Sequence, residues 1–337
     1  MAGQGAFIFG CEGLSLTPAE HAFFARVKPW GFILFGRNIA DPAQVTALTG
    51  ALRDVVGYDA PIFIDQEGGR VARLTAPHWR EWLPALDQVH QNKRYAARSM
   101  YLRYRIIADE LRAIGIDGNC APLADIATPD THAILHNRCY GDDVLKVAEI
   151  AGSVAQGLID GGVLPVLKHI PGHGRATADS HLELPRVKTK ERELKWSDFM
   201  AFEPLSGLPL AMTAHVVFDA LDEVHCATVS PTVIDMIRTH IGFGGVLMSD
   251  DISMQALDGP LTQRSQAALA AGCDVILHCN GQMAEMKDVA AAAGPLSEIA
   301  QSRADAALTW RRDPAPIDIE AATAEFQSLM MGQAGNG

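Results

Sequence analysis

The sequence predicts an α/β fold, specifically a single-domain (β/α)8 TIM barrel. Eight short apolar runs of the kind found in buried strands recur along the 337 residues, and longer segments with helical patterns separate most of them. Alternating strands and helices form parallel sheets covered on both faces, and a count of eight strands is typical of a closed barrel. An open doubly wound sheet would give similar runs, so it stays an alternative.

Each expected strand is a short run of mainly apolar residues that polar or glycine-containing residues follow. The eight runs are Ala6–Phe9, Gly31–Phe35, Pro61–Ile64, Asp117–Ala121, Leu164–Leu167, Leu208–Met212, Gly245–Met248 and Cys273–Leu277. The intervening segments that fit helices are Pro18–Val27, Pro42–Val55, Lys93–Ile114, Val144–Ile159, Ser230–His240 and Gln263–Ala271. Proline follows a capping residue at Thr17, Asp41 and Ser230, which is the pattern of a helix start.

We expect the barrel to occupy residues 1–312, because no shift in composition marks an earlier domain boundary. The prolines of Asp313-Pro314-Ala315-Pro316 interrupt the helical pattern at that point. Residues 313–337 are expected to form a C-terminal tail with a short amphipathic helix within Ile317–Met331.

Composition argues against several classes of function. The net charge of −12 and the pI near 5.4 argue against nucleic acid or an anionic membrane as a partner. No window approaches the roughly 18 apolar residues of a membrane span, and Met1–Glu20 lacks the Lys or Arg of a signal peptide. We therefore expect a cytoplasmic protein, with a monomer as the default oligomeric state.

Two residue types carry further expectations about burial. The six cysteines include no C-x-x-C pair and mostly sit in apolar runs, which predicts reduced, buried thiols rather than disulfide bonds. A basic stretch predicts the solvated face of a helix, and its members are Lys93, Arg94, Arg98, Arg103 and Arg105.

Polar residues gather where five of the expected strands end. These residues are Asp65 to Arg73, Asp125, Lys168 to His181, His215 and Ser249-Asp250-Asp251. The segment Lys168–His181 is the richest, because it combines a lysine, three imidazoles and a carboxylate. Its Pro171 and two glycines predict an irregular loop. Each group alone could be a helix cap, but in a (β/α)8 barrel all five ends share the face where active sites lie.

Two pairs within these groups have the chemistry of catalysis. Adjacent residues that leave a strand point to opposite faces, so either Asp250 or Asp251 is expected to face the barrel mouth as a nucleophile or general base. Asp179 and His181 lie two residues apart and can meet, and a carboxylate beside an imidazole raises its pKa and fixes its tautomer. Such a histidine suits general acid and base catalysis. Both pairs could instead cap or order their own loops.

Five further residues offer the donors and acceptors that bind hydroxyl groups or a carboxylate. They are Asp65, Arg73, Arg138, Lys168 and His169. Arg138 could equally pair with Asp142 or Asp143 on the surface.

From about Phe7 to Met283 the sequence resembles glycoside hydrolase family 3, and within it the bacterial cytoplasmic β-N-acetylglucosaminidases of peptidoglycan recycling. The matching motifs are Gly31–Asn38, Asp65–Arg73, Ala121–Asp125, Lys168–His181, Met212–His215 and Ser249–Met254. Lys168–His181 is the most specific, because it joins the family's sugar-binding Lys-His to the Asp-x-His dyad of its hexosaminidase branch. The sequence departs from that branch at Ile170, where Phe is common, and at Cys139-Tyr140, where Ser-Phe is common.

The resemblance implies a retaining mechanism in which Asp250 forms a glycosyl-enzyme intermediate. His181 would act as acid and base with Asp179 as its partner. Asp65, Arg73, Arg138, Lys168 and His169 would bind the N-acetylglucosamine ring. The implied substrate is a small carbohydrate from peptidoglycan, N-acetylglucosamine linked to 1,6-anhydro-N-acetylmuramic acid with or without its peptide. This chemistry needs no metal and no organic cofactor.

Three other functions stay open. The pattern His169-x3-His173 near His181 has the residue types of a zinc hydrolase, although Pro171 removes the helix that would bring both histidines to one metal. A histidine in place of a glutamate leaves the pocket less negative, so phosphate could replace water and the enzyme would be a phosphorylase. A sugar-binding protein without catalysis would keep the same fold.

Overall fold

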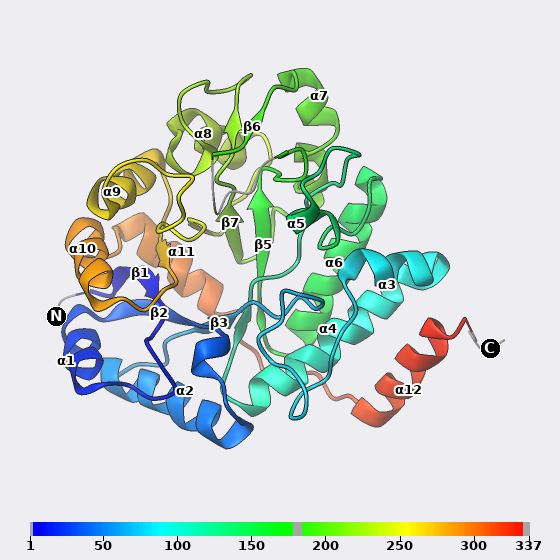
Figure 1. Cartoon of the computed structure of the whole chain (residues 1–337), viewed down its shortest axis with the longest axis horizontal. Coiled ribbons are helices and arrows are strands. Elements are labelled where there is room, and N and C mark those ends of the chain that lie inside the picture. Colours follow the sequence, from blue (N-terminus) through cyan, green and yellow to red (C-terminus); the bar gives the residue numbers. More distant parts are fainter. Residues whose placement is uncertain (1–2, 178–183, 333–337) are drawn as a thin grey trace.

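A barrel of eight parallel strands forms the centre of the molecule (Figure 1). The computed structural model describes residues 3–177 and 184–332. The barrel strands are β1 (Gly5–Phe9), β2 (Pro29–Leu34), β3 (Ile62–Ile64), β4 (Gly118–Asn119), β5 (Leu164–Ile170), β7 (Leu210–Thr213), β9 (Val246–Met248) and β10 (Ile276–His278). Their order is β10-β1-β2-β3-β4-β5-β7-β9, and every paired neighbour runs parallel.

The two strands at the ends of this order meet. A parallel bridge joins Met248 of β9 to Val275, the residue before β10, and Ser249 donates its N–H to the carbonyl of Val275 at 3.0 Å. This contact closes the sheet into a barrel, as the sequence predicts, and excludes the open doubly wound sheet.

Helices surround the barrel on its outer side (Figure 1). They are α1 (Pro18–Val27), α2 (Pro42–Val56), α3 (Ala85–Gln91), α4 (Ala96–Ala113), α5 (Ala133–His136), α6 (Val144–Asp160), α7 (Glu191–Trp196), α8 (Pro231–Thr239), α9 (Leu261–Ala271), α10 (Met283–Ala293), α11 (Glu298–Leu308) and α12 (Ile319–Met330). Short 3-10 turns lie at Gly36–Asn38, Lys93–Tyr95, Phe199–Ala201, Glu203–Leu205 and Ala227–Val229. The predicted caps are confirmed, because Thr17, Asp41 and Ser230 each accept a backbone N–H from the first turn of their helix.

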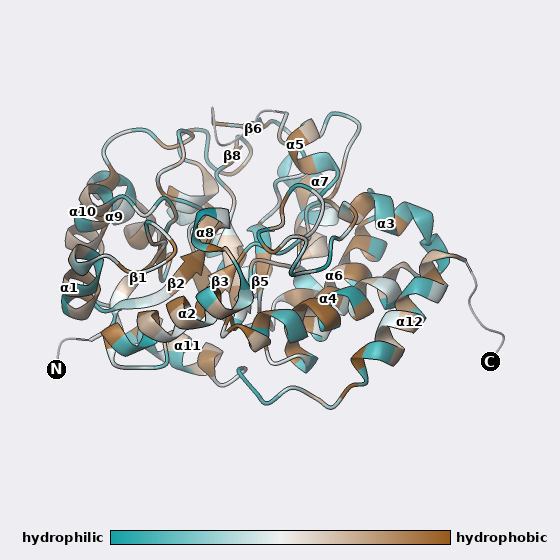
Figure 2. Cartoon of the chain, turned by 60° about the horizontal axis from the view of Figure 1, so that its bottom comes forward, coloured by the Kyte–Doolittle hydropathy of each residue, from teal (hydrophilic) through white to brown (hydrophobic). Residues whose placement is uncertain are grey.

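Two apolar layers hold the barrel. Side chains such as Trp30, Phe63 and Val166 fill its interior, and a larger cluster packs the outer face of the strands against the helices. Figure 2 shows hydrophobic residues on the central strands and on the inner parts of the helices. Five cysteines are buried and Cys279 is half-buried, all of them free, so the prediction of reduced thiols is confirmed.

The loops at the carboxyl ends of the strands carry extra structure. β6 (Arg186–Val187) and β8 (Val217–Phe218) form a separate parallel pair. In Figure 2 this pair lies at the top of the molecule, together with α5 and α7. These elements follow β4, β5 and β7 in the chain, so they cover the face on which the sequence predicts chemistry.

The expectation of a solvated basic helix face is wrong at Arg103 and Arg105, which are 0% and 2% exposed. Both lie on α4, and α12 packs against that helix through a small apolar cluster that includes Leu102 and Leu329. α12 lies at the edge of the molecule beside α4 (Figure 1). The expected boundary at residue 313 stays a prediction. Among the described helices, none has the length and apolar character needed to cross a membrane.

Candidate active site

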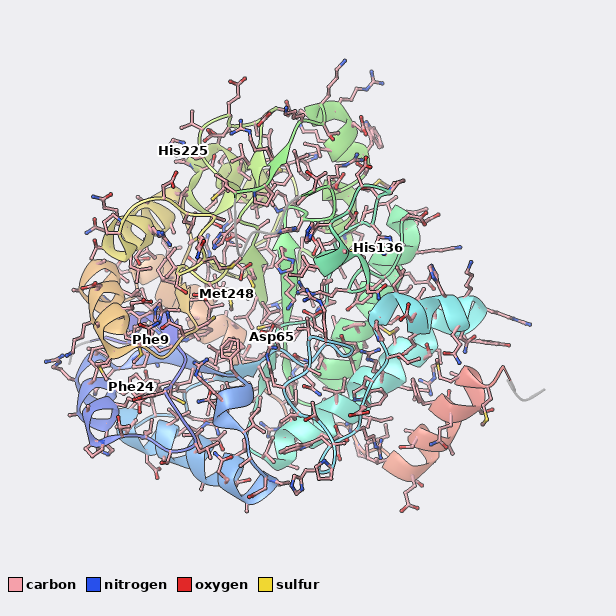
Figure 3. The ribbon with its side chains drawn as sticks, viewed as in Figure 1. Phe9, Phe24, Asp65, His136, His225 and Met248 are labelled. Atoms are coloured by element: carbon pink, nitrogen blue, oxygen red, sulfur yellow. The ribbon has the colours of Figure 1, made fainter. Side chains whose placement is uncertain are left out.

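A cavity of about 300 Å³ opens at the carboxyl ends of the barrel strands. Six of the eight residues that the sequence singles out line it, namely Asp65, Arg73, Arg138, Lys168, His169 and Asp250. Figure 3 shows Asp65 near the middle of the view down the molecule, where the strands converge. The other two, Asp179 and His181, lie outside the described residues.

The strands themselves position most of these side chains. Asp65 directly follows β3, and Asp250 comes two residues after β9. The prediction of an irregular loop from Lys168 onward is wrong for the first three residues, because β5 continues to Ile170. Proline lacks only its own N–H, so the strand can run up to the residue before Pro171. Lys168 and His169 therefore belong to the strand, although the pairing of β5 with β7 shifts register between Leu167 and Ile170.

A network of ion pairs lines one side of the cavity. Lys168 Nζ lies 3.0 Å from Asp65 Oδ1 and 2.6 Å from Glu67 Oε1. Arg73 Nη2 donates to Asp65 Oδ2 at 3.1 Å. Arg138 binds Glu67 with two parallel hydrogen bonds, of 2.9 Å from Nε and 2.8 Å from Nη2. Arg138 thus turns inward rather than pairing with Asp142 or Asp143, the alternative that the sequence left open.

The mutual charges of this network fix the ionisation of its members. Burial raises the pKa of Asp65, but Lys168 and Arg73 outweigh it and hold that pKa well below its ordinary value. Burial also raises the pKa of Glu67, and there Arg138 and Lys168 lower the net value to about 2. Burial lowers the pKa of Lys168, whereas Asp65 and Glu67 raise it above the ordinary range. Both carboxylates and the amine are therefore charged at neutral pH.

A buried carboxylate orients the imidazole of His169. Asp125 Oδ2 lies 2.7 Å from His169 Nδ1, which places a proton on Nδ1 and leaves Nε2 as the other ring nitrogen. Asp125 also accepts the backbone N–H of His173 at 2.6 Å. Burial raises the pKa of Asp125, but His169 outweighs it and the net pKa is lowered. Burial lowers the pKa of His173 to about 4, so that ring is neutral at pH 7.

The adjacent aspartates after β9 both line the cavity, so the expectation that only one of them faces the barrel mouth is wrong, but their environments differ. Within the described part of the chain, the Asp250 carboxylate accepts one hydrogen bond, from the backbone N–H of Asp251 at 2.8 Å. Asp251 instead accepts from both the backbone and the hydroxyl of Ser253, and Cys279 donates its N–H at 3.3 Å. Burial raises the pKa of Asp250, but His215 and His169 outweigh it and lower the net pKa. Asp250 is therefore ionised, and the described residues supply it with few hydrogen bonds.

Sequence reasoning missed two acidic partners. Glu67 belongs to the stretch after β3, but only the fold brings it against Arg138, which follows it by 71 positions. The sequence places Asp125 at a strand end, but it does not predict the pairing of Asp125 with His169, because that pairing depends on β4 and β5 being neighbours in the barrel. Apolar wall residues of the cavity, such as Phe35, Ile134 and Met254, carry no signal that distinguishes them from core.

Metal binding was one of the alternatives. Within residues 3–177 and 184–332, no group of three or more His, Cys, Asp or Glu side chains is arranged to hold a metal ion. In that part of the chain, His169 Nδ1 faces Asp125, and the rings of His169 and His173 are 5.4 Å apart and tilted.

Comparison with known proteins gives a consistent result. The family model "Glycosyl hydrolase family 3 N terminal domain" matches residues 22–310. A protein of Alkalilimnicola ehrlichii named beta-hexosaminidase is 35% identical over 284 residues, which is 82% of this chain and 81% of that protein.

Two solved structures extend the similarity to three dimensions. NagZ from Neisseria gonorrhoeae, in complex with N-trifluoroacetyl-D-glucosamine, superposes with a TM-score of 0.83 at 28% identity, over 99% of this chain and 98% of that one. A glycoside hydrolase family 3 beta-N-acetylglucosaminidase from a Paenibacillus species has the same TM-score at 29% identity, and the match covers 96% of this chain and 66% of that one.

Proposed function

This chain belongs to glycosyl hydrolase family 3, and from that premise we propose that it is a retaining exo-β-N-acetylglucosaminidase. Family membership and the names of its relatives identify the protein as a glycoside hydrolase. The observation that carries the finer proposal is the ionised, lightly hydrogen-bonded Asp250 in the same cavity as Asp65, Arg138 and Lys168. In this proposal Asp250 is the reactive carboxylate, and it shares the cavity with groups that can bind sugar hydroxyls.

In the proposed first step, an Asp250 oxygen attacks the anomeric carbon of the sugar. The bond from that carbon to the leaving oxygen breaks, and His181 donates its proton to that oxygen. In the second step His181 takes a proton from water, the water oxygen attacks the same carbon, and the bond to Asp250 breaks. Asp179 would hold the His181 ring and stabilise its charged form.

The binding groups suit a pyranose ring with several hydroxyls. Each oxygen of Asp65 is engaged by one cation, Lys168 or Arg73, and retains a lone pair that can accept a sugar hydroxyl proton. The Nε2 atom of His169 remains available on the cavity side, because Asp125 engages Nδ1. A relative that binds N-trifluoroacetyl-D-glucosamine supports N-acetylglucosamine as the ring that is released.

We infer that the natural substrate is a peptidoglycan fragment, N-acetylglucosamine linked to 1,6-anhydro-N-acetylmuramic acid with or without peptide. Incubation with such a fragment, followed by mass spectrometry and by NMR of the first-formed anomer, tests this directly. Release of N-acetylglucosamine with retained configuration is the expected result. Inverted configuration or an intact fragment would contradict it. The expected cytoplasmic location and monomeric state stay predictions.

The nucleophile is tested with a matched pair of variants, Asp250→Asn and Asp251→Asn. Asp250→Asn is expected to abolish turnover of an aryl β-N-acetylglucosaminide, because an amide cannot form the intermediate. Asp251→Asn removes a loop cap, so it should lower stability and leave much more activity. Similar activity in the two variants would remove Asp250 from the chemistry.

The acid is tested with His181→Ala and two leaving groups. A poor leaving group needs the proton and should lose far more rate than an activated phenol. Equal losses on both substrates would argue against the acid role of His181.

A further inference from the structure

Arg103 is a buried cation that forms no ion pair with any residue that the structure describes. Its side chain is 0% exposed, and among the described residues no carboxylate oxygen lies within 4.0 Å of the guanidinium. Its Nε is also buried without a hydrogen-bond partner there. Burying a charge without a counter-ion is expensive. The contacts that Arg103 does make therefore have to offset the free-energy cost of burying its charge.

Those contacts hold the backbone of the loop after β3. Arg103 Nη2 donates to the carbonyl of Glu67, and the hydroxyl of Tyr104 donates to the same oxygen at 3.3 Å. Nη1 donates to Gln88 Oε1 at 2.8 Å. Gly68 has φ +117°, and a Cβ at that position would overlap Arg103 Nη2. The guanidinium is therefore packed directly against the Glu67–Gly68 peptide.

Arg103 also contacts Trp82, which is hydrogen-bonded to the same loop. The guanidinium of Arg103 lies 5.6 Å from the centroid of the Trp82 ring, and the carbonyl of Trp82 accepts the N–H of Gly69 at 2.8 Å. Arg103 thus contacts the turn directly at Glu67 and Gly68, and indirectly, through Trp82, at Gly69. A change at Arg103 would release the turn on two sides.

The side chain of Glu67 connects the loop that Arg103 holds to two residues of the cavity. Its two oxygens hold Arg138 by a bidentate pair and Lys168 at 2.6 Å. Both cations line the cavity, whereas Glu67 and Arg103 are not among its lining residues. A shift of the Glu67 backbone would therefore displace two groups that face the sugar.

We propose that Arg103 is a positioning residue for sugar binding, which acts through Glu67 on Arg138 and Lys168. The proposal rests on the proposed function for the identity of the ligand. Arg103 donates hydrogen bonds to the Glu67 carbonyl and to Gln88 Oε1, so a neutral side chain of similar length without N–H groups cannot replace it.

The chain supplies a matched control in Arg105. Arg105 is also buried on α4, has a buried Nη1 without a partner among the described residues, and donates to the carbonyl of Ala315 in the C-terminal segment. Arg103→Met and Arg105→Met therefore remove the same groups from the same helix, but only the first touches the loop after β3.

Steady-state kinetics with an aryl β-N-acetylglucosaminide separate the two roles. Arg103→Met is expected to raise KM about tenfold, the effect of losing a hydrogen bond to a charged group, with a smaller change in kcat. Arg105→Met should lower Tm by about as much as Arg103→Met does, but it should keep KM within about twofold of wild type. Equal KM values in the two variants would overturn the proposal.

Two further measurements keep the proposal decidable. If Arg103→Met does not fold, Gln88→Leu removes the acceptor of Nη1, together with the 3.4 Å hydrogen bond from Gln88 Nε2 to Ser99 Oγ, and leaves the guanidinium in place. This variant should still raise KM, and an unchanged KM there overturns the proposal. If wild type does not turn over the substrate, the proposed function fails, and crystal structures of the variants decide on Arg103. Loss of one Arg138–Glu67 hydrogen bond in Arg103→Met supports the proposal, and an unmoved pair refutes it.

Discussion

Replacing Glu67 by glutamine removes the negative charge at the centre of the ion-pair network while keeping the shape of the side chain. The five charged groups Asp65, Glu67, Arg73, Arg138 and Lys168 carry a net charge of +1, which becomes +2 in the variant. The new amide nitrogen must face either Arg138 or Lys168, both of which are donors. Removing one partner of a buried ion pair costs about 3–5 kcal/mol. We expect a loss of free energy of unfolding of that order at pH 7.

The pH dependence of this loss gives a sharper test than its size. The pKa of Glu67 is about 2 in the folded protein and about 4.5 in the unfolded chain. A lowered pKa contributes stability that is fully present above pH 4.5 and is lost as the pH falls toward 2. The difference between wild type and Glu67→Gln should therefore be full at pH 7 and shrink at pH 3 to 4.

Urea unfolding followed by tryptophan fluorescence measures this difference, because the chain contains five tryptophans. The same denaturation series is run for both proteins at pH 7, 5 and 3.5. A difference below about 1 kcal/mol at pH 7, or one that does not change with pH, would refute the reasoning from buried charge.

Four further outcomes follow from the same contacts. Burial raises the pKa of Glu110 to about 7, although Arg80 Nε lies 3.7 Å from one of its oxygens. A carboxyl group with a raised pKa contributes to the stability of the folded protein below pH 4.5, and this contribution is lost as the pH rises through 7. Glu110→Gln should therefore raise Tm at pH 8 and leave it unchanged at pH 4, and an equal shift at both would contradict this. Phe326→Ala removes the ring that meets Trp82 edge-on at 5.3 Å, so it should lower Tm by a few degrees and retain kcat; an unchanged Tm would mean that α12 adds little. Activity should survive dialysis against EDTA, and loss that zinc restores would revive the metal-dependent alternative. Turnover should be independent of phosphate, with free N-acetylglucosamine rather than its 1-phosphate as product.

Local signals were enough to predict the order of the barrel. Proline after Thr17, Asp41 and Ser230 marks helix starts that the structure contains, because capping depends on residues within one turn. The positions of the strands are also predicted from the sequence, because a strand that is buried on both faces requires a continuous run of apolar residues. The position of Asp250 at the barrel mouth follows from the same pattern, because a strand end fixes the rim to which its next residues belong.

Contacts between distant segments could not be predicted in this way. The burial of Arg103 depends on the loop after β3 and on Trp82, neither of which is visible in the sequence around α4. The periodicity of a helix shows which residues share a face, but not whether another element covers that face. The pairing of Glu67 with Arg138 likewise needs the fold to bring two loops together.

Among the described residues, three carboxylates line this cavity, and their hydrogen-bond partners give them different reactivity as nucleophiles. Each oxygen of Asp65 is held by a cation, and both oxygens of Asp251 are engaged within its own loop and by Cys279. A carboxylate oxygen that accepts strong hydrogen bonds is a weak nucleophile, because attack on carbon requires those bonds to be given up. Among the described residues, Asp250 accepts one backbone hydrogen bond, and although burial raises its pKa, His215 and His169 lower the net pKa below the ordinary value. Among the described residues this difference in hydrogen bonding, rather than residue type or distance along the chain, supports the proposal that Asp250 and not its neighbour attacks the sugar.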